Sequence, residues 1–128
     1  MRIPPGFTTV TPYFFVNGAA RFLDFLVQGL GGVEIDRTLD GDRIANAQVR
    51  LGTSTVMLSE ASAAFPAMPA SYYLYVEDAD AAMTRAMAAG GTKIMEVADM
   101  PYDDRQGGLR DPWGNIWWIS QRLVDGPY

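Results

Sequence analysis

Few residues in this chain could do chemistry, because its 128 positions include no histidine and no cysteine. Without a thiol, disulfides, thiolate metal sites and a catalytic cysteine are excluded. Without an imidazole, catalytic triads, histidine-based zinc or iron sites and a histidine general base are excluded as well. Any acid–base chemistry therefore falls to aspartate, glutamate, tyrosine or arginine.

The carboxylates are the first candidates for such a role. Glu60 lies at the end of a predicted strand, and Asp103 and Asp104 lie in a polar loop that we expect over residues 99–108. The pattern does not force any of them inside the fold, and their spacing does not predict a buried pair of carboxylates. Together with Arg105, the two aspartates are equally typical of a salt-bridged loop without chemistry.

The phenols and guanidinium groups are the second set of candidates. Tyr73 or Tyr75 could act as an acid only with a lowered pKa, which requires a cation such as Arg110 beside it. Arg50 and Arg110 are planar forked donors that could hold an anionic group of a ligand, or pair with acidic residues at the rim of a site.

An internal repeat with an offset of sixty positions indicates which elements must position these residues. Residues 13–32 read YFFVNGAARFLDFLVQGLGG, and residues 73–92 read YLYVEDADAAMTRAMAAGGT. Each copy passes from an aromatic strand through a turn into a helix that ends at glycines. Arg50 and Arg110 keep the same offset, and one extra residue then aligns Met57 with Trp118. A repeat of this kind indicates two copies of one structural unit.

Hydrophobic periodicity predicts a βαβββ order in both copies. In the first copy, which covers about residues 8–60, we expect strands at 8–16, 33–39, 44–51 and 55–60 and a helix at 19–30, capped by Asn17. In the second copy, about residues 71–122, we expect strands at 71–76, 92–97, 109–110 and 115–122 and a helix at 79–89. Residues 61–70 read as the linker, and the whole chain, 1–128, as a single domain of α+β class.

Three segments resemble the vicinal oxygen chelate superfamily, which includes glyoxalases, extradiol dioxygenases and bleomycin-resistance proteins. They are GDRIANAQVRLGTSTVMLS in the first copy, and YVEDADA and YDDRQGGLRDPWGNIW in the second. The resemblance covers residues 8–122. It implies two tandem βαβββ units that form a cup-shaped, curved mixed sheet with the helices on the convex side.

The same resemblance implies four metal-ligand positions in the cup, and this sequence departs from the family there. The four positions carry Thr11, Met57, Ser71 and Trp118. None of these side chains is a good ligand for a divalent metal. Asn46 and Gln48 also stand where many relatives have His and Glu. We therefore expect no metal and no other cofactor, and no metal-dependent glyoxalase or dioxygenase activity.

Alternation along the strands predicts the lining of the cup, which we expect to be aromatic with a few polar groups. Tyrosine and phenylalanine on a strand are also typical of ordinary packing, and Trp118 is the strongest single candidate for a ligand contact. The predicted ligand-binding residues are Tyr13, Phe15, Asn46, Gln48, Arg50, Met57, Ser71, Tyr73, Tyr75, Arg110 and Trp118.

These observations favour a metal-independent protein of the bleomycin-resistance type that binds a small aromatic or amphipathic molecule. Two alternatives stay open: a cofactor-free glyoxalase-like enzyme of lyase or isomerase type, and a structural module whose cup is filled by its own side chains. The resemblance also implies a homodimer.

Composition limits the partners and the location. The formal net charge of −5 and the pI of about 4.5 do not suit a nucleic-acid partner, which needs a basic surface. No apolar run reaches the length of a membrane span, and the first residues lack a signal-peptide pattern, so we expect a cytoplasmic protein without a membrane partner.

Overall fold

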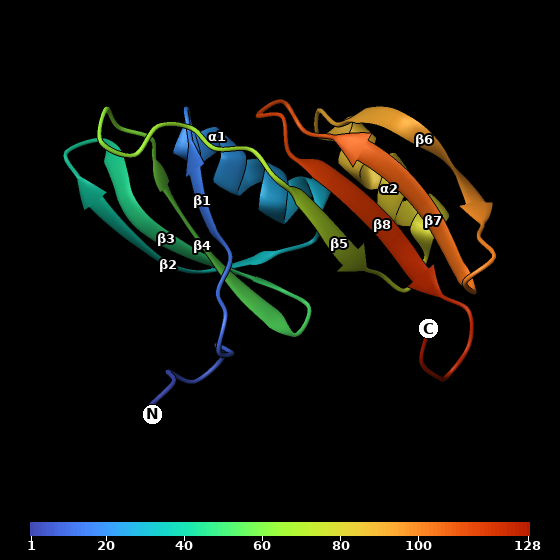
Figure 1. The fold of residues 1–128 in the computed structure, drawn as a ribbon. Helices are drawn as coiled ribbons and strands as arrows, with labels where there is room; N and C mark the ends of the chain where they lie inside the picture. Colours follow the sequence, from blue (N-terminus) through green and yellow to red (C-terminus); the bar gives the residue numbers. More distant parts are fainter. The chain divides into compact units, whose positions relative to one another are not determined.

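Two units with the same order of elements make up the chain in the computed structural model, which describes all 128 residues (Figure 1). The first unit covers Met1–Pro69 and the second covers Ala70–Tyr128. Each consists of a strand, a helix and three further strands. The predicted α+β class and the tandem βαβββ repeat are confirmed, and the assignment of both units to one domain stays a prediction.

The first unit forms a four-stranded mixed sheet in the order β1-β4-β3-β2. β1 and β4 are parallel, and the other neighbours are antiparallel. Its elements are β1 (Tyr13–Val16), α1 (Ala19–Asp24), the π-helical turn η1 (Phe25–Gly29), β2 (Val33–Asp40), β3 (Arg43–Leu51) and β4 (Ser54–Glu60).

The second unit repeats this topology in the order β5-β8-β7-β6, again with a parallel pair at β5 and β8. Its elements are β5 (Ser71–Tyr75), α2 (Ala79–Ala88), β6 (Thr92–Asp99), β7 (Asp104–Arg110) and β8 (Ile116–Arg122). No helix in the chain is both long enough and apolar enough to cross a membrane.

Each helix covers one face of its own sheet and creates a core there (Figure 1). In the first unit that core includes Phe14, Phe22, Leu26, Val49 and Leu58, and in the second it includes Met83, Ala86, Leu109, Trp117 and Ile119. Because side chains alternate along a strand, the intervening residues point to the opposite face. That opposite face carries the predicted ligand-binding residues of each unit.

The first helix differs from the prediction in its start and in its geometry. The N-cap is Gly18, with φ 85°, rather than Asn17. The carboxylate of Glu60 accepts hydrogen bonds from the backbone N–H groups of Gly18 and Ala19, both at 2.9 Å. Glu60 therefore anchors the start of the first helix. In the second unit Gln121, its equivalent in the repeat, accepts from the N–H of Ala79 at 3.0 Å.

The predicted strand 8–16 is shorter than expected, since β1 begins only at Tyr13. Pro12 has no N–H group to donate to a sheet ladder, although its carbonyl still accepts from Met57 N at 2.9 Å. The predicted single helix 19–30 also ends earlier as an α-helix. Its last turn is π-helical, and this turn brings Phe25 into the core together with Leu26.

The expected polar loop 99–108 is wrong, because β6 extends to Asp99 and β7 already begins at Asp104. The glycines of this strand concealed it, since glycine is depleted in strands. Packing explains them. A Cβ on Gly107 would lie 2.8 Å from Val97 and 3.1 Å from Met83, and a Cβ on Gly108 would lie 2.8 Å from the ring of Trp118.

Candidate ligand-binding site

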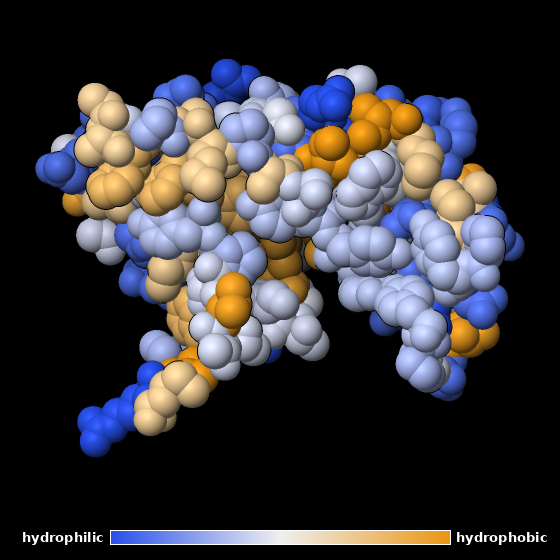
Figure 2. Space-filling model, in the orientation of Figure 1, coloured by the Kyte–Doolittle hydropathy of each residue, from blue (hydrophilic) through white to orange (hydrophobic).

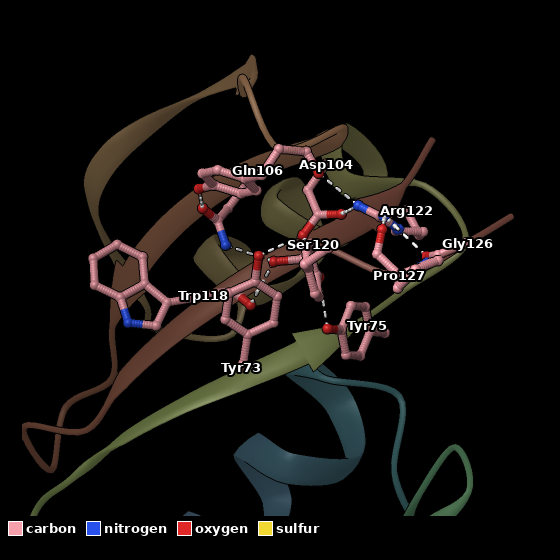
Figure 3. Close-up of polar contacts among 11 residues, drawn as sticks. Tyr73, Tyr75, Asp104, Gln106, Trp118, Ser120, Arg122, Gly126 and Pro127 are labelled. Atoms are coloured by element: carbon pink, nitrogen blue, oxygen red, sulfur yellow. Dashed lines mark hydrogen bonds and ion pairs between the residues drawn. The ribbon is translucent and has the colours of Figure 1, made fainter. Parts of the chain in front are cut away.

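A fully buried carboxylate lies at the centre of a polar cluster on the exposed face of the second sheet (Figure 3). Asp104, at the start of β7, is 0% exposed and pairs in register with Arg122 of β8. Its Oδ2 accepts from the phenols of Tyr73 at 2.5 Å and Tyr128 at 2.6 Å. Its Oδ1 accepts from the Arg122 guanidinium at 3.0 Å. Register and strand polarity thus bring together residues from β5, β7, β8 and the segment that follows β8.

A second phenol extends this chain of hydrogen bonds. The hydroxyls of Tyr75 and Tyr128 are 2.6 Å apart. Tyr128 has one phenolic hydrogen and donates it to Asp104, so Tyr75 is the donor in this contact. The chain therefore runs from Tyr75 through Tyr128 to the carboxylate.

The electrostatics of the cluster keep Asp104 charged and its phenols neutral at neutral pH. Burial by itself raises the pKa of Asp104, but the hydrogen bonds from Tyr128, Tyr73 and Arg122 outweigh it, and the pKa lies below its usual value of 3.8. Burial raises the pKa of both Tyr73 and Tyr128 above the usual 10, and the hydrogen bond to Asp104 raises it further. The phenols therefore act as hydrogen-bond donors, and the carboxylate acts as an acceptor.

A buried amide and a hydroxyl continue the cluster along β7 and β8. Gln106 is 3% exposed, and its Nε2 donates to Ser120 Oγ at 2.7 Å. Its Oε1 accepts from the hydroxyl of Tyr102. Both ends of the amide are occupied, so the orientation of Gln106 is fixed before any ligand arrives.

Aromatic rings border the polar cluster on the same face. The rings of Tyr73 and Tyr75 form a tilted pair with their centroids 5.2 Å apart, and the two residues are 44% and 56% exposed. Trp118 pairs in register with Tyr73 on one side and with Gly108 on the other, and its ring lies over Gly108. In Figure 2 the surface over β8 is coloured mostly in pale tones, which mark side chains of intermediate hydropathy. Such a face suits a flat organic molecule.

The first unit carries a smaller version of this arrangement at the predicted positions. Tyr13 pairs in register with Met57, which pairs in turn with Gln48. The Nδ2 of Asn46 donates to the hydroxyl of Tyr13 at 3.2 Å, and the rings of Tyr13 and Phe15 are 5.1 Å apart. These predicted residues therefore share one face of the first sheet.

The remaining predicted residues are Arg50 of the first sheet and Ser71 and Arg110 of the second. Arg50 uses its Nε to donate to Gly52 O of the following turn, at 3.1 Å. Ser71 and Arg110 both pair in register with Ile116, and both are exposed. Arg110 is thus at the opposite end of β7 from Asp104. The condition for an acidic tyrosine is not met at Tyr73, whose hydroxyl contacts a carboxylate rather than a cation.

Six residues of the cluster were not among the predicted ligand-binding residues: Tyr102, Asp104, Gln106, Ser120, Arg122 and Tyr128. The repeat itself contained a signal for one of them, since an offset of sixty from Asn46 leads to Gln106. Alternation carried back from Arg110 along β7 leads through Gln106 to Asp104. No comparable signal points to Tyr128, which reaches the cluster from outside the repeat.

The side chains at the positions where the resemblance implies metal ligands do not fit a divalent metal. The β8 position carries Trp118, whose indole N–H can only donate a hydrogen bond and has no lone pair for a metal ion. The β5 position carries the hydroxyl of Ser71. No three acidic side chains gather anywhere in the chain in a way that could hold a metal ion.

The fold and this face define a class of proteins: tandem βαβββ repeats in which each sheet keeps one face free of its helix. Residues 7–119 match the Glyoxalase/Bleomycin resistance protein/Dioxygenase superfamily, and the chain belongs to this family.

Sequence relatives and solved structures agree with this assignment. An uncharacterized protein of Mycobacterium tuberculosis (strain ATCC 25618 / H37Rv) is 30% identical over 124 residues, which cover 88% of this chain and 73% of that protein. TioX from Micromonospora sp. ML1 has a similar structure, with a TM-score of 0.75 and 22% identity, over 94% of this chain and 100% of TioX. TnmS3, an antibiotic binding protein from Streptomyces sp. CB03234, has a TM-score of 0.69 and 21% identity, over 90% and 97% of the two chains. At these identities the two structures show a shared fold.

Proposed function

We propose that this chain is a metal-independent small-molecule-binding protein of the bleomycin-resistance type, which holds an aromatic ligand against the exposed face of its second sheet. One observation carries the proposal: exposed tyrosine rings and Trp118 border a set of polar groups that are already fixed by hydrogen bonds. Preorganised groups lose little conformational entropy when a ligand binds. Flat aromatic surface is the complement of such a border.

The protonation states support binding over acid–base catalysis. A general base works best with a pKa near the operating pH, whereas the pKa of Asp104 is lowered below 3.8. The pKa of Tyr73 moves above 10, which makes it a poor acid at neutral pH. These side chains suit the recognition of a ligand that is released unchanged. A role in antibiotic resistance, by sequestering a drug, belongs to the proposal, with TnmS3 as an antibiotic-binding relative in fold.

Tryptophan fluorescence provides the test of this proposal. The panel consists of bleomycin-type and other aromatic drugs, phenolic acids and small anionic metabolites. We expect at least one compound to cause a saturable change in emission that persists in Trp113→Phe and is lost in Trp118→Phe. Trp117 serves as a silent background, because it is 2% exposed and its Nε1 donates to Asp111.

Calorimetry separates loss of signal from loss of binding. Trp118→Ala should weaken the affinity for the same compound at least about tenfold, because a stacking surface is removed. Unchanged affinity in Trp118→Ala, or a flat response of the folded protein to the whole panel, contradicts the proposal.

The equivalent face of the first unit, with Tyr13, Phe15, Asn46, Gln48 and Met57, is proposed as a second binding surface of the same kind.

A homodimer is part of the same proposal. β2 is an edge strand, and its Val33, Ile35 and Leu39 are 53–61% exposed in the single chain. Exposed apolar edge strands favour pairing with another chain. Light scattering should therefore give twice the 14.0 kDa mass of one chain. Ile35→Lys should shift the protein toward the monomer, whereas Asp42→Lys in the following turn should not, and a monomeric parent protein contradicts the proposal.

A further inference from the structure

The cluster around Asp104 already contains a bound phenol, which the chain itself supplies. Residues 123–128 follow β8 without regular secondary structure and return toward the start of β7, where Leu123 N donates to Asp103 O at 2.9 Å. The guanidinium of Arg122 donates to the carbonyls of Gly126 at 3.0 Å and Pro127 at 2.9 Å (Figure 3). This course places the side chain of Tyr128 on the face that we propose as the binding site.

The contacts of Tyr128 are those expected for the recognition of a phenol. Its hydroxyl donates to Asp104 Oδ2 at 2.6 Å and accepts from Tyr75 at 2.6 Å. The guanidinium carbon of Arg122 lies 4.3 Å from the centroid of its ring, a cation–π distance. The ring of Tyr102 meets it edge-on at 6.4 Å. Donor, acceptor and ring face are therefore all satisfied at once.

The contacts that keep Tyr128 in place are mostly polar, so a ligand with the same polar groups can replace its side chain. The residue is 69% exposed, so little apolar surface is buried against it. Asp104, in contrast, is 0% exposed while Tyr128 is in place. If Tyr128 leaves, Oδ2 loses one of its two phenolic donors, and this acceptor position becomes free for another hydrogen-bond donor. A ligand that brings a donor of the same kind restores the cluster.

We infer that the ligand of this face bears a phenolic hydroxyl that takes the place of the Tyr128 hydroxyl on Asp104, and that segment 123–128 is the internal occupant that it displaces. This inference rests on the proposed function and names its ligand class. A neutral donor is favoured over an ammonium group, because Arg122 lies 3.0 Å from Oδ1 and already balances the carboxylate charge. An ammonium group in the same place would be repelled by the guanidinium.

The probe for this inference is p-cresol, the side chain of tyrosine as a free molecule, titrated by ligand-observed NMR. A short tether gives an internal ligand a high effective concentration, so the intact chain should bind p-cresol weakly. Tyr128→Ala should tighten the apparent affinity on the order of tenfold, because it removes the internal competitor. Tyr128→Phe keeps the ring but loses both hydrogen bonds, so it should also tighten the affinity for p-cresol. This variant replaces Tyr128→Ala in the test if the alanine variant does not fold.

Two further ligands test the phenol assignment in both variants. They are 4-methylanisole, which lacks the donor, and benzylamine, which carries an ammonium group, and both should bind at least about tenfold more weakly than p-cresol.

Circular dichroism checks that each variant is folded before its affinity is compared with that of the parent chain. Equal affinity of the parent chain and both variants for p-cresol overturns the inference, as does no binding to any of them. Benzylamine or 4-methylanisole binding as tightly as p-cresol overturns the phenol assignment. A Trp118-dependent response to the drug panel that is unaffected by Tyr128→Ala would leave the proposed function standing while this inference fails. If the folded parent protein shows no Trp118-dependent response to any compound of the panel, the proposed function itself is contradicted.

Discussion

Asp111→Ala is expected to lower the free energy of unfolding by at least about 3 kcal/mol, the largest loss of stability that we predict for a single substitution outside the apolar core. The carboxylate of Asp111 is 3% exposed and accepts four hydrogen bonds at 2.9 Å. The donors are the backbone N–H groups of Trp113 and Asn115, the Asn115 amide and the Trp117 indole. Alanine leaves buried donors without partners, and each such donor costs about 1–3 kcal/mol.

Chemical denaturation monitored by circular dichroism measures this effect. Asp125→Ala is the matched control, because Asp125 lies on the exposed segment after β8 and its loss should change stability by less than about 0.5 kcal/mol. A decrease below about 1 kcal/mol for Asp111→Ala would show that the four hydrogen bonds do not hold the turn. The expected result assigns the Asp-Pro-Trp-Gly segment a structural role, which is to orient β8 and with it Trp118.

Asp104→Asn is expected to reduce stability by about 2 kcal/mol at neutral pH, because it removes a charge-assisted contact to Arg122 and weakens two phenolic hydrogen bonds. It should also change the acid sensitivity of the protein. The pKa of Asp104 is lower in the folded chain than its usual 3.8. The unfolded chain therefore binds more protons near this pH, and the stabilisation, complete above the unfolded pKa, is lost as the pH falls through the folded pKa.

Denaturation curves recorded between pH 2 and pH 7 separate these contributions. The parent protein should lose stability steeply below about pH 4, and Asp104→Asn should lose less over the same interval. Asp80→Asn is the comparison for an exposed ion pair, since Asp80 is 58% exposed where it meets Arg105, and it should change the curve only slightly. Parallel curves for the parent and Asp104→Asn would mean that this carboxylate is not preferentially ionised in the folded chain.

The predicted architecture agrees with the structure wherever local patterns decide it. Alternation placed Tyr13 and Phe15 opposite the buried Phe14 and Val16, as the burial of β1 shows. Because the two copies are related by a constant offset, the elements predicted in one copy could be compared with those predicted in the other. Two of the boundaries that failed have local causes, which are the proline before β1 and the two glycines in β7. Val97 and Met83 exclude a Cβ at Gly107, and the Trp118 ring excludes one at Gly108.

The sequence by itself determined the tandem βαβββ units, the face of each sheet that its helix leaves uncovered, and the aromatic residues on that face. These follow from a side-chain period of two in strands and of 3.6 in helices, which are properties of neighbouring residues. Only the tertiary structure decided that Asp104 is buried, that it is paired with Arg122, and that Tyr128 shares it with Tyr73. Such contacts depend on strand register and on the path of residues 123–128, which bring together groups that are far apart in the chain and whose pairing no local period encodes.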